Sequence, residues 1–265
     1  DFGLETATDV LLTGCSAGGL ATFLHADYVD DHLLPPTVTR FKAAPISGFF
    51  LLHPTKYGKP LYPDEMRYVY NMQECSNGVN QKCVDSAAEG EDWKCIFAQE
   101  AYKHIKSPIM PLNSALDSWQ MGNIWQADNY CYQSFMSNCT ASEVKDLNGY
   151  LHDFISDFFN SNTSSKAGNG AFIESCIEHC NVGINDDSWS GYKIGGKVVR
   201  DALLDWWNAP VSANSEDHTY KPCEPSTTAP FVCNPTCAAK DHLHVFKEAG
   251  LDISPEYTQV DTPEL

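Results

Sequence analysis

Short apolar runs alternate along most of the chain with stretches whose apolar residues recur at helical spacing. Residues 10–13, Val-Leu-Leu-Thr, form a β-favouring run that ends at Gly14, and a helix-like stretch begins at Leu20. The other runs that predict strands lie at residues 41–50, 107–113 and 171–173. The other helical patterns lie at residues 147–159 and 198–207, and residues 66–101 predict several helices tied by disulfides. This alternation predicts the α/β class, with a mostly parallel sheet flanked by helices.

The domain organisation follows from length and composition. With 265 residues, 43% of them hydrophobic and 20% charged, the chain suits one globular domain with a large core. We expect a single catalytic domain over residues 1–237, whose last part, residues 210–235, is a cysteine-tied surface segment. The polar residues 238–265 predict a C-terminal tail.

Cysteine usage favours an oxidising compartment. Ten of the eleven cysteines fall between Cys75 and Cys237, and disulfides explain them better than a metal, because the closely spaced pairs lack a partner at zinc-finger spacing. Two triplets, at Asn138 and Asn162, have the form of glycan acceptors. Together these features predict a secreted glycoprotein without a bound metal. We expect Cys15 to be a free packing residue.

Charge and hydropathy exclude some partners. A net charge of −18 argues against nucleic acid and would repel a polyanion unless its binding groove is locally neutral or positive. No apolar run reaches the roughly 18 residues of a membrane-spanning helix. We therefore expect no nucleic-acid partner and no membrane span.

The segment Gly14-Cys15-Ser16-Ala17-Gly18 has the G-x-S-x-G pattern of a nucleophile elbow. The alternative is an ordinary glycine-rich turn, but the predicted strand before it and helix after it are the context that an elbow requires. The turn makes Ser16 the candidate nucleophile. The N–H of Ala17, at the start of the helix, is the candidate oxyanion donor.

A serine nucleophile needs a histidine base and a carboxylate, which in this fold follow it along the chain. His179 and Asp117 each follow a predicted strand, where loops carry catalytic residues. Position alone does not distinguish His179 from a histidine with a structural role, or Asp117 from a solvated surface aspartate. Asp146 and Asp153 are weaker candidates because they fit the polar face of a helix. The remaining histidines lie on predicted helices or in polar segments: His25, His32, His53, His104, His152, His218, His242 and His244.

Several motifs match one family in order. They are residues 11–20 at the elbow, Gly48-Phe49-Phe50, residues 112–120 around Asp117, residues 172–180 up to His179-Cys180, and residues 233–237. On these motifs the chain resembles the pectin acetylesterases, which are related to the Notum carboxylesterases. The resemblance implies an α/β-hydrolase fold and a triad of Ser16, Asp117 and His179 that needs no cofactor.

The resemblance also shows two departures. In the family a Gly-Gly-Gly-Trp type loop upstream of the elbow supplies the second oxyanion donor, whereas here fifteen residues precede Ser16. We therefore expect the first strands of the sheet to be missing, residues 10–13 to have one open flank, and an upstream segment of the same precursor to complete sheet and oxyanion hole. Relatives often carry cysteines where this chain has Ala26 and Ala43. Cys131 with Cys139 is the local pair that we favour.

These observations predict a secreted serine esterase that removes O-acetyl groups from a polysaccharide. One alternative is a Notum-like esterase for longer acyl chains, which would need a deep apolar pocket beside the serine. The other is a non-catalytic subunit of an extracellular assembly that keeps an esterase-derived fold. The intact set of serine, histidine and aspartate argues against this last possibility.

Overall fold

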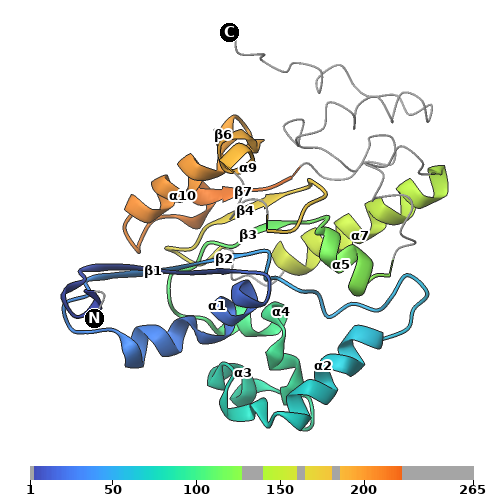
Figure 1. Cartoon of the computed structure of the whole chain (residues 1–265), viewed down its shortest axis with the longest axis horizontal. Helices are drawn as coiled ribbons and strands as arrows, with labels where there is room; N and C mark the ends of the chain where they lie inside the picture. Colours follow the sequence, from blue (N-terminus) through green and yellow to red (C-terminus); the bar gives the residue numbers. More distant parts are fainter. Residues whose placement is uncertain (1–2, 127–139, 160–164, 181–185, 223–265) are drawn as a thin grey trace, which may run out of the picture.

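A parallel sheet forms the centre of the molecule (Figure 1). The computed structural model describes residues 3–126, 140–159, 165–180 and 186–222. The sheet runs in the order β1-β2-β3-β4-β7, and every neighbouring pair is parallel. Its strands are β1 (Asp9–Cys15), β2 (Arg40–Ile46), β3 (Leu112–Ser114), β4 (Ala171–Glu174) and β7 (Thr219–Tyr220). The longest pairing joins β1 to β2, from Asp9 opposite Arg40 to Cys15 opposite Ile46.

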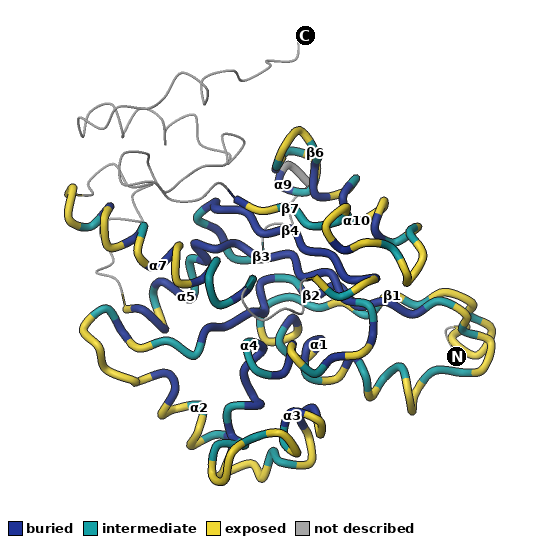
Figure 2. Tube along the Cα trace, turned by 180° about the vertical axis from the view of Figure 1, so that it is seen from behind, coloured by how far each residue is buried: buried dark blue, intermediate teal, exposed yellow. Residues whose placement is uncertain are grey.

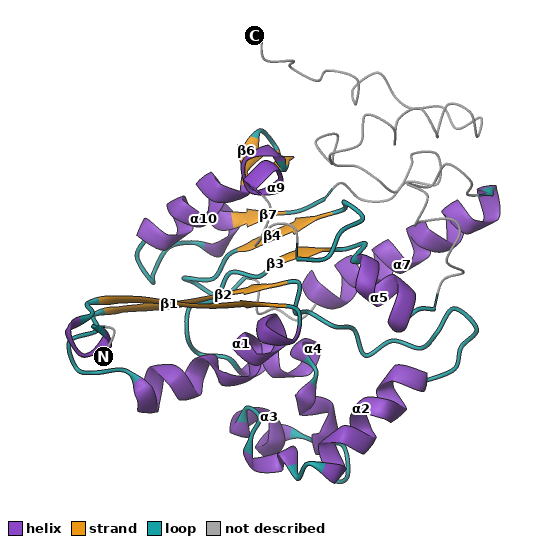
Figure 3. Cartoon of the chain, in the orientation of Figure 1, coloured by secondary structure: helices purple, strands orange, loops and turns teal. Residues whose placement is uncertain are grey.

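Helices connect the strands, as the parallel order requires (Figure 3). The α-helices are α1 (Ala17–Tyr28), α2 (Leu61–Met72), α3 (Gln81–Ser86), α4 (Ala98–Ala101), α5 (Ser118–Asn123), α7 (Ala141–Phe159), α9 (Asp186–Gly191) and α10 (Val199–Asn208). Short 3-10 turns lie at η1 (Leu4–Thr6), η3 (Cys75–Asn77), η4 (Asp92–Ile96), η5 (Tyr102–His104) and η6 (Ser215–His218), and one π-helical turn, η2 (Val29–Leu33), follows α1. A small antiparallel hairpin pairs β5 (Lys193–Ile194) with β6 (Lys197–Val198).

The central strands β2, β3 and β4 are buried on both faces, and successive side chains point to opposite sides of the sheet. In β4, Ala171 and Ile173 pack into the cluster formed with α1, α4 and α7, whereas Phe172 packs with α10 on the other side. The tube in Figure 2 is dark along β2, β3 and β4 for this reason. Two separate apolar layers therefore sandwich the sheet.

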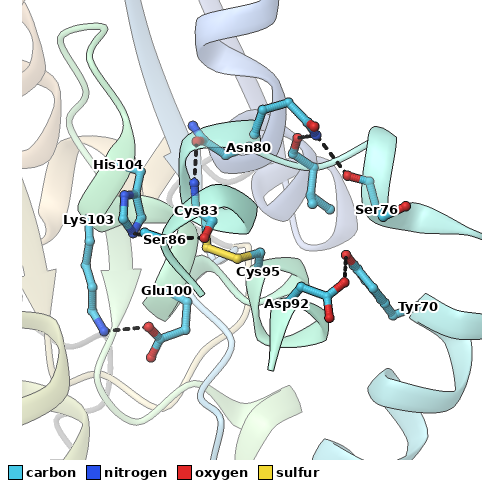
Figure 4. Close-up of a disulfide and its surroundings, with 12 residues drawn as sticks. Tyr70, Ser76, Asn80, Cys83, Ser86, Asp92, Cys95, Glu100, Lys103 and His104 are labelled. Carbon is cyan, nitrogen blue, oxygen red and sulfur yellow. Dashed lines mark hydrogen bonds and ion pairs between the residues drawn. A yellow bond between two sulfur atoms is a disulfide. The ribbon is translucent and has the colours of Figure 1, made fainter. Parts of the chain in front are cut away.

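A third apolar cluster forms a helical lobe below the sheet in the view of Figure 1. It joins α2, α3 and η4, and the Cys83–Cys95 disulfide ties the last two together (Figure 4). Tyr70 of α2 donates a hydrogen bond of 2.8 Å to Asp92 at the start of η4. The prediction of helices tied by a disulfide over residues 66–101 is therefore confirmed.

The sequence patterns predicted most of this architecture, including the α/β class. The strand predicted at residues 41–50 ends earlier, at Ile46, where Ser47 takes a positive φ of 46°. Strand β7 and the β5–β6 hairpin were not predicted. The boundary proposed at residue 237 lies outside the described residues and stays a prediction. No helix in the described ranges is long and apolar enough to cross a membrane.

Strand β1 lies at one end of the sheet order, as expected for a strand with an open flank. Among the described strands it pairs with β2 alone. Its residues are exposed or partly buried, and Leu11 keeps 38% of its surface exposed. The nucleophile strand therefore presents an unpaired backbone edge within the described part of the chain.

Candidate active site

Ser16 lies in the turn between β1 and α1, with a backbone conformation of φ 59° and ψ −123° that non-glycine residues rarely adopt. The turn is held by a hydrogen bond of 3.0 Å from the Ser16 N–H to the Ile46 carbonyl of β2. Close packing requires glycine nearby, since a Cβ on Gly19 would lie 2.2 Å from that same carbonyl oxygen. This is the strained strand-turn-helix geometry predicted for a nucleophile elbow.

Three polar side chains from distant parts of the chain meet at this turn. The Ser16 Oγ lies 2.8 Å from His179 Nε2, and His179 Nδ1 lies 2.7 Å from Asp117 Oδ2. Asp117 is fully buried and caps α5, because its Oδ1 accepts the N–H of Gln120 at 3.0 Å. The three residues selected from the sequence therefore form one continuous hydrogen-bonded chain.

The environment of these groups suits proton transfer. Burial disfavours the imidazolium of His179, but the hydrogen bond and charge of Asp117, together with the charge of Glu178, outweigh it and raise the His179 pKa above its ordinary value. Burial also raises the pKa of Asp117, and hydrogen bonds from His179 and from the backbone of Gln120 and Trp119 oppose that shift. Asp117 can thus orient the imidazole and stabilise its protonated form.

A disulfide joins Cys15, directly before the serine, to Cys180, directly after the histidine. The prediction that Cys15 is a free packing residue was therefore wrong. Sequence spacing gave no hint of this pair because 165 positions separate its members. The Cys180 N–H also donates a hydrogen bond of 3.0 Å to the Ser47 hydroxyl, which anchors the His179 loop at a second point.

Two aromatic rings lie near the imidazole of His179. The ring of Trp119 is stacked at a centroid distance of 6.2 Å, and that of Phe50 lies at 6.4 Å. The Gln120 side chain joins the two segments by accepting the Leu51 N–H and donating to the Phe49 carbonyl, both at 3.1 Å. Sequence reasoning identified none of these side chains as part of the site, although the Gly-Phe-Phe and Ser-Trp-Gln segments stand out in it.

Ala17 is the first residue of α1, so its N–H has no acceptor within the helix. It lies next to Ser16, at the positive end of the helix dipole, where it can face a developing oxyanion. The backbone N–H groups of Gly18 and Gly19 occupy the next two positions of the same first turn. This arrangement is compatible with the oxyanion role predicted for Ala17.

The alternative residues lie elsewhere. His53 contacts Asp153 at 3.2 Å, at the exposed side of α7, and Asp146 also lies on α7 without a contact to the triad. Over the described ranges, no group of three or more potential metal ligands comes together. Asn138, Asn162 and the pair of Cys131 with Cys139 fall outside the described residues.

The fold and site together define the α/β-hydrolase class: a parallel sheet flanked by helices, with a serine elbow beside a histidine and an aspartate. Within that class, the sequence model of the pectinacetylesterase family matches residues 1–238. The chain therefore belongs to the pectinacetylesterase family.

Individual relatives agree with this assignment. Pectin acetylesterase 5 of Arabidopsis thaliana is 31% identical over 248 residues, which cover 89% of this chain and 53% of that protein. Palmitoleoyl-protein carboxylesterase notum1 of Xenopus laevis is 25% identical, over 91% of this chain and 49% of its own length. The chain thus spans about half the length of the curated relatives that it matches.

A solved structure shares the fold. The Wnt deacylase Notum from Drosophila aligns with a TM-score of 0.62 at 20% identity, over 87% of this chain and 59% of the Notum chain. At this identity the similarity supports the architecture alone.

Proposed function

We propose that the chain carries the nucleophile of a carboxylic ester hydrolase that removes acetyl groups from a carbohydrate. The observation that carries the proposal is the hydrogen-bonded series Ser16–His179–Asp117, with separations of 2.8 and 2.7 Å. Each member follows a parallel strand: Ser16 follows β1, Asp117 follows β3 and His179 lies in the loop after β4. A purely structural subunit would not need these three side chains in register.

The chemistry follows from the geometry. His179 Nε2 takes the proton of the Ser16 hydroxyl while Oγ attacks the ester carbonyl, and the imidazolium then protonates the departing alcohol. The resulting acyl-enzyme is cleaved by water, which His179 activates in the same way. Asp117 keeps the Nδ1 proton in place throughout, and the Ala17 N–H stabilises the oxyanion in both steps.

Acetyl is the acyl group that we favour, on an acetylated polysaccharide outside the cell. The support is comparative: two Arabidopsis pectin acetylesterases are each 31% identical to this chain, whereas the notum relatives reach 25% or less. The disulfide between Cys15 and Cys180 supports an oxidising, extracytosolic location. Glycans at Asn138 and Asn162 would fit the same route.

A further segment of the same precursor completes the active protein in this proposal. Its support is the backbone edge of β1, which pairs on one side among the described strands and leaves Leu11 partly exposed. A strand added there would also bring backbone N–H groups close to the elbow, as a second oxyanion donor.

Hydrolysis of p-nitrophenyl acetate and p-nitrophenyl octanoate by the purified protein tests the function. We expect turnover of the acetate, little turnover of the octanoate, and loss of both in Ser16→Ala. Gly149→Ala on α7 serves as a control outside the site, because a Cβ there would meet no atom within 4 Å. A preference for the octanoate would favour a longer acyl chain, and hydrolysis that survives Ser16→Ala would refute the assignment.

A further inference from the structure

Two buried glutamates lie in the segment that leads from β4 to His179, and the catalytic scheme above uses neither. Glu174 ends β4 and is 1% exposed, and Glu178, which immediately precedes His179, is 3% exposed. Their carboxyl groups lie close enough to interact electrostatically. Buried carboxyl groups are costly, so such a pair next to a catalytic base needs a physical explanation.

The backbone holds this pair firmly against the aspartate side of the site. The Ala115 N–H donates to the Glu174 carbonyl at 2.7 Å, and the Ser118 N–H donates to the Glu178 carbonyl at 3.0 Å. One Glu174 carboxyl oxygen also accepts the Cys176 N–H. The segment from Glu174 to His179 is thus fixed against the residues around Asp117.

When two neighbouring carboxyl groups are buried in a protein, burial and mutual repulsion favour one bound proton over two ionised groups. Burial, then the charge of Glu178, raises the pKa of Glu174 well above its ordinary value, and the charge of Asp117 adds to the effect, while the Cys176 N–H opposes it. These effects favour the protonated form of Glu174.

The remaining charge acts on the catalytic base. The acidic groups that face His179 are Asp117, from the start of α5, and Glu178, and the charges of both raise the pKa of His179. Tyr150 of α7 reaches the same region through its hydroxyl, which donates to Gln120 at 3.3 Å. Burial, followed by the charge of Asp117, raises the Tyr150 pKa well above its ordinary value, so Tyr150 stays neutral.

We propose that Glu174 and Glu178 share a single proton and act as a positioning pair for His179. The pair keeps one negative charge next to His179 and thereby sets the pH at which the imidazole becomes a base. The proposal rests on the esterase function described above. It extends the triad by two residues that touch neither substrate nor the serine.

The pH dependence of kcat/KM in glutamine variants tests the pair. Glu174→Gln and Glu178→Gln each leave one carboxylate, whereas the double variant leaves none. We expect the acid limb of the profile to move to lower pH by about one unit in the double variant, and by less in either single variant. Glu89→Gln, which removes an exposed carboxylate of the helical lobe, should leave the limb unchanged. An acid limb of the folded double variant that coincides with that of Glu89→Gln would overturn the proposal.

Two readouts do not depend on turnover. The infrared difference spectrum between the wild-type protein and Glu174→Gln at neutral pH should show the loss of one protonated carboxyl group. Its absence would refute the shared proton even if the double variant failed to fold. If no protein in the series hydrolyses esters, the proposed function fails. NMR titration of the His179 ring then tests whether the pair acts on the imidazole, because the His179 pKa should be lower in the double variant than in the wild type.

Discussion

Removal of the Cys15–Cys180 disulfide should weaken both the fold and the site. The bridge closes a sequence separation of 165 residues, for which the chain-entropy relation gives a contribution of about 5 kcal/mol to the free energy of unfolding. It also joins the residue before the nucleophile to the residue after the base. We expect Cys15→Ala/Cys180→Ala to lose about that much stability and to lower kcat roughly 10- to 100-fold, because the His179 loop is no longer fixed against the elbow.

The second disulfide provides the matched control. Cys83–Cys95 spans 12 residues in the helical lobe, so the same relation gives about 3 kcal/mol (Figure 4). Cys83→Ala/Cys95→Ala should therefore lose about 2 kcal/mol less stability than the other double variant and keep the kcat of the wild type. Urea unfolding and ester hydrolysis below the unfolding transition measure the two effects. Unchanged kcat without the Cys15–Cys180 bridge, or a larger stability loss in the control, would refute this reasoning.

Two further predictions concern the base and the elbow. Because the His179 pKa is raised and the neutral imidazole is the base, kcat/KM should fall as the pH drops through a value above the ordinary histidine pKa of about 6.5. Asp117→Asn should move this acid limb to lower pH and lower kcat by about 10⁴-fold. An acid limb that stays in place in Asp117→Asn would contradict the coupling between Asp117 and His179. Gly19→Ala should prevent folding or lower the melting temperature sharply, since its Cβ would lie 2.2 Å from the Ile46 carbonyl oxygen. Gly18→Ala, whose Cβ would meet no atom within 4 Å, should melt like the wild type. Equal melting temperatures of the two variants would refute the close packing at the elbow.

The sequence predicted the parts of this protein that local chemistry determines. The elbow is readable because a β-favouring run, the G-x-S-x-G turn and a helix follow one another within a few residues. Asp117 and His179 were selected by their positions after predicted strands and by family resemblance; in the structure His179 contacts Ser16, and Asp117 contacts His179. The apolar stripe of α7 was readable over residues 147–159, and the helix itself begins earlier, at Ala141.

What the sequence could not show depends on contacts between distant segments. The Cys15–Cys180 pair exists only because the sheet brings the β1 and β4 loops together. Strand β7 consists of Thr219 and Tyr220, too short for any periodicity, and pairs only because β4 offers an edge. The β5–β6 hairpin had a local signal that the sequence analysis did not use: Gly195-Gly196, both at positive φ, lies between Lys193-Ile194 and Lys197-Val198.

The identity of the nucleophile is the central claim, and covalent labelling tests it most directly. The purified protein is treated with an alkyl fluorophosphonate, which reacts with an activated serine, and the modified residue is located by peptide mass spectrometry. We predict one equivalent of label on Ser16, and loss of labelling in Ser16→Ala and in His179→Ala, since the serine then lacks either its hydroxyl or its base. A protein that hydrolyses p-nitrophenyl acetate but carries the label on another residue would contradict the account.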